Sequence, residues 1–186
     1  MEEVFIPPDS QQRLMRLSRL TLESFVRGAQ RQIDDTRDLY LLASEYGAFV
    51  SLHKGKELRG CIGTCFPTHP LYETVIEMTE AAASRDHRVR PIQAGELGEI
   101  QIEISVLSSL ATAPDPLSLE IGRHGIHVAS GENRAVFLPQ VATQYEWDME
   151  TFLAELCLKA GLSESAWRQA ETTISSFTTL VIGEGR

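Results

Sequence analysis

The segment 47–64, GAFVSLHKGKELRGCIGT, constrains the fold more than any other part of the chain. Two stretches rich in apolar and β-branched residues flank Lys54-Gly55-Lys56, whose composition is typical of a hairpin turn. Side chains alternate between the two faces of a strand, so each stretch has one more apolar face and one more polar face. The segment therefore predicts an antiparallel hairpin.

The length of the connecting loop decides which side chains share a face of this hairpin. An even loop would bury the Arg59 guanidinium among aliphatic residues, which is costly for an isolated charge. Because register follows the hydrophobic pattern, we expect the odd loop Gly55-Lys56-Glu57. This loop pairs one apolar set with another: Ala48, Val50 and Leu52 with Leu58, Gly60 and Ile62. The second face then contains Phe49, Ser51, His53, Arg59, Cys61 and Gly63, with His53 near Arg59 and Ser51 near Cys61.

That second face suggests a reactive site. Arg59 and Cys61, two residues apart on a strand, lie about 7 Å apart at their Cα atoms, and a nearby guanidinium lowers the pKa of a thiol. Gly60 and Gly63 leave space in which a ligand or another backbone segment can approach. We therefore expect Cys61, Arg59 and His53 as candidate catalytic residues, with Gly60 and Gly63 as ligand-binding positions. The alternative is that Arg59 pairs with a carboxylate and Cys61 is inert packing.

Hydrophobic periodicity and turn residues predict the rest of the chain as an α+β fold, with a mostly antiparallel sheet and flanking helices. We expect one domain over residues 1–186, built as one or two lobes. The expected helices run from about Ser10, as N-cap, to Ile33, from Pro70 to Ser84, and from Asp148, as N-cap, to Lys159. The other expected strands are Ile100–Val106, a second hairpin over Gly125–Leu138, and a last strand over Thr172–Ile182.

Charge and cysteine content exclude several classes of function. The formal net charge of −9 argues against a nucleic-acid backbone or an anionic membrane as the main partner. No apolar run approaches the roughly 20 residues that span a bilayer, and the acidic start MEEVFIPPDS lacks the features of a signal peptide. Three cysteines do not make a disulfide framework, so we expect a cytoplasmic protein.

Three further groups of polar residues are candidates for binding. Cys61, Cys65 and His69 are spaced by three residues each, but structural zinc usually has four ligands at closer spacing, so we expect no metal and no cofactor. Arg85 and Asp86 follow a predicted helix end, either as a ligand-binding pair or as a local salt bridge. Gln140 follows Pro139, where its amide could bind a ligand or satisfy backbone groups.

Motifs along nearly the whole chain resemble one family. They are GAFVSLHKGKELRGCIGT, PTHPLYETVIEM, AAASRD, EIQIEISVLS, IGRHGI, LPQVAT and FLAELCLKAGL. The chain is similar to the AMMECR domain family, called AmmeMemoRadiSam system protein A in bacteria and archaea. The residues that match the family's motifs here include Leu58–Gly63, Arg85, Asp86 and Leu138–Val141, whereas His87 stands where the family's pattern has a proline.

The resemblance implies an α+β fold with a larger and a smaller lobe that meet at a cleft near Leu58–Gly63. It also implies company with a Memo-like protein, related to extradiol dioxygenases, and with a radical-SAM protein, but it supplies no reaction. We therefore expect an accessory or binding module that works with such a partner. The alternative is an enzyme that uses Cys61 as nucleophile or redox thiol, assisted by Arg59 and His53.

Overall fold

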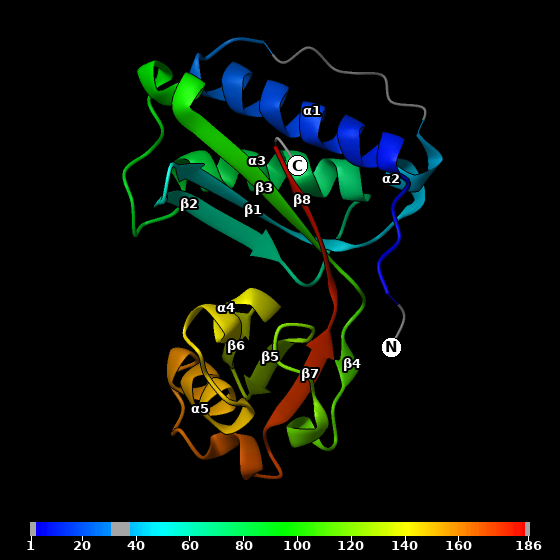
Figure 1. The fold of residues 1–186 in the computed structure, drawn as a ribbon, viewed down its shortest axis with the longest axis vertical. Coiled ribbons are helices and arrows are strands. Elements are labelled where there is room, and N and C mark those ends of the chain that lie inside the picture. Colours follow the sequence, from blue (N-terminus) through cyan, green and yellow to red (C-terminus); the bar gives the residue numbers. More distant parts are fainter. Residues whose placement is uncertain (1–2, 31–37, 185–186) are drawn as a thin grey trace. The chain divides into compact units, whose positions relative to one another are not determined.

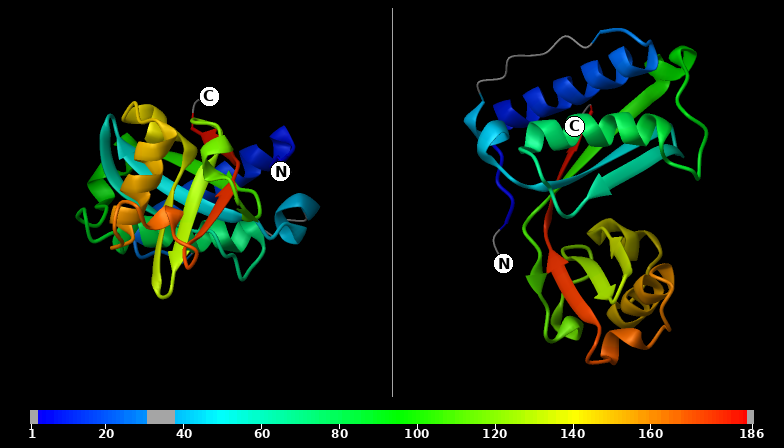
Figure 2. Two further views of the ribbon diagram at one scale, coloured as in Figure 1. Left: turned by 90° about the horizontal axis from the view of Figure 1, so that it is seen from below. Right: turned by 180° about the vertical axis from the view of Figure 1, so that it is seen from behind.

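The computed structural model describes residues 3–30 and 38–184. The chain divides into two compact units (Figures 1 and 2). The larger unit contains residues Phe5–Leu107 and Leu180–Arg186, and the smaller unit contains Met1–Val4 and Ser108–Thr179. The C-terminal strand therefore joins the unit that the N-terminal half of the chain builds.

The larger unit is an antiparallel sheet with helices on one face. Its sheet has the strand order β2–β1–β3–β8, so β2 and β8 are the two edges. The strands are β1 (Gly47–Lys54), β2 (Glu57–Thr64), β3 (Ile100–Leu107) and β8 (Thr179–Gly183). The helices are α1 (Pro8–Val26), the short α2 (Leu39–Ala43), α3 (Leu71–Ser84) and a 3-10 turn at Ala94–Glu99.

Helices α1 and α3 lie side by side over this sheet (Figures 1 and 2). Aliphatic residues of β1 and β3, such as Val50, Leu52 and Ile104, are completely buried. The hydroxyls of Ser18 on α1 and Thr79 on α3, also buried, are 2.8 Å apart and hydrogen-bond the two helices together. The predicted α+β fold is confirmed, and the core of this unit lies between the sheet and the two helices.

The register of the first hairpin is as predicted at its centre, but the predicted loop is wrong. Val50 lies opposite Ile62, Leu52 opposite Gly60, and Ser51 opposite Cys61. The turn contains only Gly55 and Lys56, because Lys54 pairs with Glu57 and His53 with Leu58. The register shifts between Leu52 and His53, and Arg59 is the extra residue of a β-bulge on β2. The bulge reconciles an even turn with the register that the buried apolar face requires.

The smaller unit has its own sheet and core. Its strand order is β4–β7–β5–β6. These strands are β4 (Ala111–Thr112), β5 (Gly125–Ser130), β6 (Asn133–Phe137) and β7 (Thr173–Phe177), and they pack with the helices α4 (Pro139–Gln144) and α5 (Met149–Lys159). Asp148 caps α5, as predicted, since its Oδ1 accepts from the Thr151 amide at 2.8 Å.

Three boundaries differ from the prediction. Helix α1 begins at Pro8, so Ser10 is buried inside the helix and is not its cap. It ends at Val26, and Gly28 adopts a left-handed conformation; the predicted continuation to Ile33 enters residues outside the described ranges. The last predicted strand is two strands, β7 and β8, which belong to different sheets. None of the helices in the described ranges is both apolar and long enough to cross a bilayer.

Gly60 lets α3 pack directly on β2. A Cβ atom at Gly60 would penetrate the carbonyl group of Ala82 on α3, which is backbone and cannot rotate away. We predict that Gly60→Ala lowers the free energy of unfolding by about 1–3 kcal/mol, because such overpacking forces the helix off the sheet. Urea unfolding followed by circular dichroism measures this change. Gly98→Ala is the control, since a Cβ there meets no atom within 4 Å, and equal stability of both variants would contradict the packing role.

Candidate functional site

The outer edge of β2 is closed by side chains of the loop 85–90. Asp86 Oδ2 accepts a hydrogen bond from the Cys61 amide at 2.9 Å, and Arg88 Nη2 donates to the Cys61 carbonyl at 3.1 Å. Both main-chain polar groups of Cys61 are therefore satisfied as a neighbouring strand would satisfy them. This closure fixes the loop against the main chain of Cys61.

Asp86 and Arg88 hold one another in a fixed geometry. Asp86 is only 6% exposed, and its carboxylate accepts from the Arg88 amide, Nε and Nη2 at 3.1, 2.9 and 2.8 Å. These bonds, foremost those from the Arg88 side chain, hold the pKa of Asp86 well below its ordinary value despite burial. Asp86 is the main cause that raises the pKa of Arg88, and the Cys61 side chain raises it to a smaller degree. The Arg88 side chain is nonetheless 63% exposed, so an oriented cation faces solvent.

Cys61 is half-buried and has a hydroxyl neighbour. The Ser51 hydroxyl donates to the Cys61 sulfur at 3.2 Å, as the predicted cross-strand pair requires. The guanidinium that donates to the Cys61 main chain, and whose pKa the Cys61 side chain raises, is that of Arg88. The exposed and oriented guanidinium of Arg88 next to Cys61 can therefore receive an anionic group.

Arg59 has a structural partner. It is 9% exposed, its Nη1 forms an ion pair with Glu96, and its Nη2 donates to the Arg90 carbonyl at 3.2 Å. The side-chain hydrogen bond from Arg59 is the main cause that lowers the pKa of Glu96. The Glu96 carboxylate also accepts a hydrogen bond from the Gln93 amide. The predicted pairing of His53 with Arg59 across the hairpin is wrong, because the bulge places Leu58 opposite His53. The structure therefore agrees with the alternative in which Arg59 pairs with a carboxylate.

The remaining predicted site residues are distributed differently. The space at Gly60 is taken by the Ala82 backbone and that at Gly63 by the Phe49 ring, so protein atoms fill the positions that we expected for a ligand. Arg85 is the exposed C-cap of α3, directly before Asp86. Gln140 is exposed near the start of α4 in the smaller unit, whereas the Cys61 site is built from the larger unit.

Two contributors were missed by sequence reasoning, namely Arg88 and Glu96. A signal for Arg88 exists in the run RDHRVR, which has three arginines against one aspartate in an acidic chain. An Asp-x-Arg pair in a loop next to a strand edge favours this kind of closure. Glu96 gave no such signal, since only the fold brings it to Arg59 across 37 residues.

The other two cysteines differ from Cys61 in their surroundings. All three are free. Burial raises the pKa of Cys65 to about 11 and also raises the pKa of Cys157, which is inaccessible in the core of the smaller unit. His69 lies 3.6 Å from a Glu73 carboxylate oxygen, and within residues 3–30 and 38–184 no three His, Cys, Asp or Glu residues cluster as metal ligands.

The Asp86 closure predicts a pH dependence of stability. Because the folded-state pKa of Asp86 is depressed, its contribution is fully present above the unfolded-state pKa of about 4 and is lost as the pH falls below it. Asp86→Asn should lower the free energy of unfolding by about 1–3 kcal/mol at pH 7 and by less at pH 3. Urea unfolding at both pH values measures the difference. The exposed Asp115→Asn is the control, and an Asp86→Asn effect that does not shrink at pH 3 would contradict the ionised closure.

Comparison with known proteins assigns the family. The family model AMMECR1 matches residues 15–182. A protein of Methanothermobacter thermautotrophicus is 36% identical over 188 residues, which cover 95% of both chains, and one of Thermococcus kodakarensis is 36% identical over 92% of this chain and 88% of its own. The crystal structure of uncharacterized protein PH0010 from Pyrococcus horikoshii matches with a TM-score of 0.89 at 31% identity, covering 97% of this chain and 94% of that one. The motifs, the fold and these similarities together show that the chain belongs to the AMMECR1 family.

Proposed function

We propose that the chain is a binding module that works with a partner protein and that the loop 85–90 beside Cys61 is its contact surface. The observation that supports this most directly is Arg88, whose guanidinium is fixed by Asp86 and the Cys61 carbonyl and yet remains exposed. A cation held in place before binding loses little side-chain entropy when it meets an anionic group.

The charge of the surrounding loop supports the same proposal. Arg85, His87, Arg88 and Arg90 are all exposed, although the whole chain has a net charge of −9. A locally basic loop on an acidic protein steers an acidic surface of a partner to one place and repels it elsewhere. The partner class that we propose is a Memo-like, extradiol-dioxygenase-related protein or a radical-SAM protein, in a cytoplasmic setting, as the family resemblance implies. No reaction is assigned to this chain.

We predict that Arg88→Ala weakens binding to the Memo-like protein of the same organism by about tenfold or more, since truncating an anchored interface arginine commonly costs more than 1 kcal/mol. Isothermal titration calorimetry with both purified full-length proteins at two salt concentrations measures this loss. Because Arg88→Ala also uncovers Asp86, Arg85→Ala/Arg90→Ala is the second variant. It keeps the closure of β2 and should weaken binding mainly at low salt.

Arg123→Ala in the smaller unit is the matched control, because Arg123 is also a half-exposed arginine paired with a carboxylate. It should bind as the unchanged chain does. Unchanged binding by both loop variants, or no binding by the unchanged chain to the Memo-like or the radical-SAM protein, would overturn the proposed function.

A thiol enzyme is the second candidate, and the Ser51 hydroxyl and Arg88 beside Cys61 favour it. We predict that iodoacetamide at pH 8 labels Cys61 before Cys65 and Cys157, because burial raises the pKa of both other thiols. Peptide mass spectrometry over time identifies the labelled residue, and Cys61→Ser is the control. A Cys61 rate above that of free glutathione would support a nucleophile, whereas a lower rate would remove this candidate.

A further inference from the structure

The two edges of the sheet in the larger unit differ. At β2, Asp86 and Arg88 occupy the outward main-chain groups of Cys61. At the other edge, β8, no residue of the described ranges makes a comparable hydrogen bond to the outward main-chain groups. Protein sheets usually protect an edge with charge, proline, a bulge or a covering segment. The sequence of β8, TLVIG, provides neither charge nor proline.

An open pocket of about 460 Å³ lies beside the end of β8. It is lined by Pro8, Gln11, Gln12 and Met15 of α1 and by Ile182, Gly183 and Glu184. The lining combines residues of α1 with the end of the edge strand β8 and includes no residue of β3.

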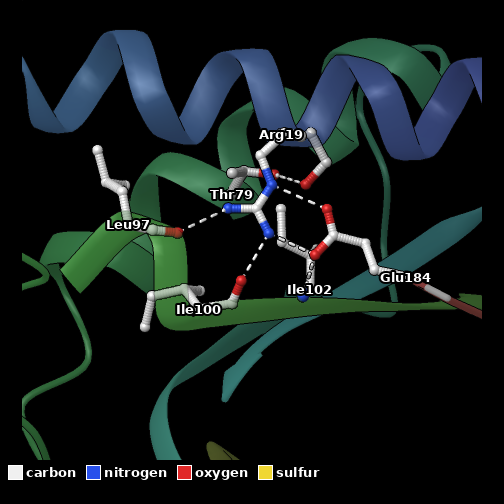
Figure 3. Close-up of polar contacts among 7 residues, drawn as sticks. Arg19, Thr79, Leu97, Ile100, Ile102 and Glu184 are labelled. Carbon is white, nitrogen blue, oxygen red and sulfur yellow. Dashed lines mark hydrogen bonds and ion pairs between the residues drawn. The ribbon is translucent and has the colours of Figure 1, made fainter. Parts of the chain in front are cut away.

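The single charged residue of the lining is already neutralised. Arg19 Nε donates to Glu184 Oε1 at 2.8 Å, and its Nη2 forms an ion pair with Oε2 (Figure 3). The same guanidinium donates to the carbonyls of Leu97 and Ile100, and the Ile102 amide donates to Glu184 Oε2 at 3.0 Å. An ionic ligand therefore meets no unpaired countercharge, while the glutamine amides and the Met15 and Pro8 side chains suit neutral, partly apolar polypeptide.

The direction of the main-chain groups can be inferred from Glu184. Its amide donates to the Ile102 carbonyl at 3.2 Å, so this residue faces β3. Because main-chain groups alternate along a strand, those of Val181 and Gly183 point away from β3. Gly183 also lines the pocket and has no side chain to obstruct an approaching backbone.

We propose that an extended, uncharged segment of a partner polypeptide adds to β8 as a fifth strand. Its main chain pairs with Val181 and Gly183, and one apolar side chain enters the pocket against Met15. The five residues of β8 offer an edge of about 17 Å at roughly 3.3 Å per residue. This surface lies at the opposite edge of the sheet from the loop 85–90, so the inference does not depend on the function proposed for that loop.

The first test uses the full-length chain without any ligand. Outward amides exchange their hydrogens with water faster than amides that pair with a neighbouring strand. We predict that the amides of Val181 and Gly183 exchange faster than those of Leu180 and Ile182, measured by nuclear magnetic resonance. Protection of Val181 and Gly183 in the free protein would show that the edge is already covered and would overturn the proposal.

The second test identifies the occupant. A phage-displayed library of random 12-residue peptides is selected on the full-length chain, and an enriched peptide is synthesised. Val181→Pro removes an outward amide without touching the ladder to β3, so it should weaken binding by about tenfold or more while leaving the fold intact. Met15→Trp, which fills the pocket, should weaken it as well, whereas Val181→Thr keeps the amide and should not.

Three outcomes would overturn this inference. One is that no peptide is enriched, and another is that enriched peptides bind Val181→Pro and unchanged chain equally. The third is a concentration-dependent dimer, seen by analytical ultracentrifugation and lost in Val181→Pro, which would assign the edge to a second copy of this chain. None of these results bears on Arg88, because Arg88→Ala leaves β8 unchanged and is tested with the partner protein.

Discussion

Burial of one face of the β1–β2 hairpin is the constraint on which the rest of the larger unit depends. Val50 and Leu52 must face α1 and α3, yet a two-residue turn would place the residues of β2 on the wrong faces. One extra residue, Arg59, resolves the conflict as a β-bulge. The bulge directs Arg59 to Glu96 and restores the alternation beyond it, so that Cys61 lies opposite Ser51 with its main-chain groups at the edge.

In this geometry Arg59 and Arg88 have different roles. Arg59 is buried and occupied by Glu96 and the Arg90 carbonyl, so it stabilises the bulge and the following loop. The guanidinium of Arg88 is held by Asp86, yet the side chain remains exposed to solvent. This combination is expected of a residue that binds another molecule. The distinction explains why an arginine next to a cysteine in sequence is a poor guide to which cation the thiol meets in space.

The two edges of the sheet in the larger unit differ in what surrounds their main-chain groups. Polar side chains replace a neighbouring strand at β2, whereas β8 ends beside a neutral pocket. Closing one edge and leaving the other open limits strand addition to one place. For the binding module that we propose, this difference leaves β8 as the edge to which an extended segment can add.

Local patterns in the sequence were sufficient for much of the fold. Alternation of apolar residues indicated β1, β2 and β3, and Asp148 identified the start of α5, because periodicity and capping depend on residues close in the chain. The central register of the hairpin was also predictable, since a one-residue slip would expose its apolar face. The division of the last predicted strand between two sheets was not predictable, because β-propensity continues through Thr178 without a breaking residue.

By itself, the sequence therefore determined the hairpin and its buried face, the acidic character of the chain, and the motifs that connect it to the AMMECR1 family. Only the tertiary structure decided that Glu96 neutralises Arg59, that Asp86 and Arg88 surround Cys61, and that α3 packs against Gly60. The physical reason is separation along the chain. Charges, hydrogen bonds and steric contacts between residues 22 to 37 positions apart exist only after packing brings them together, and no local pattern encodes which of several arginines will be paired.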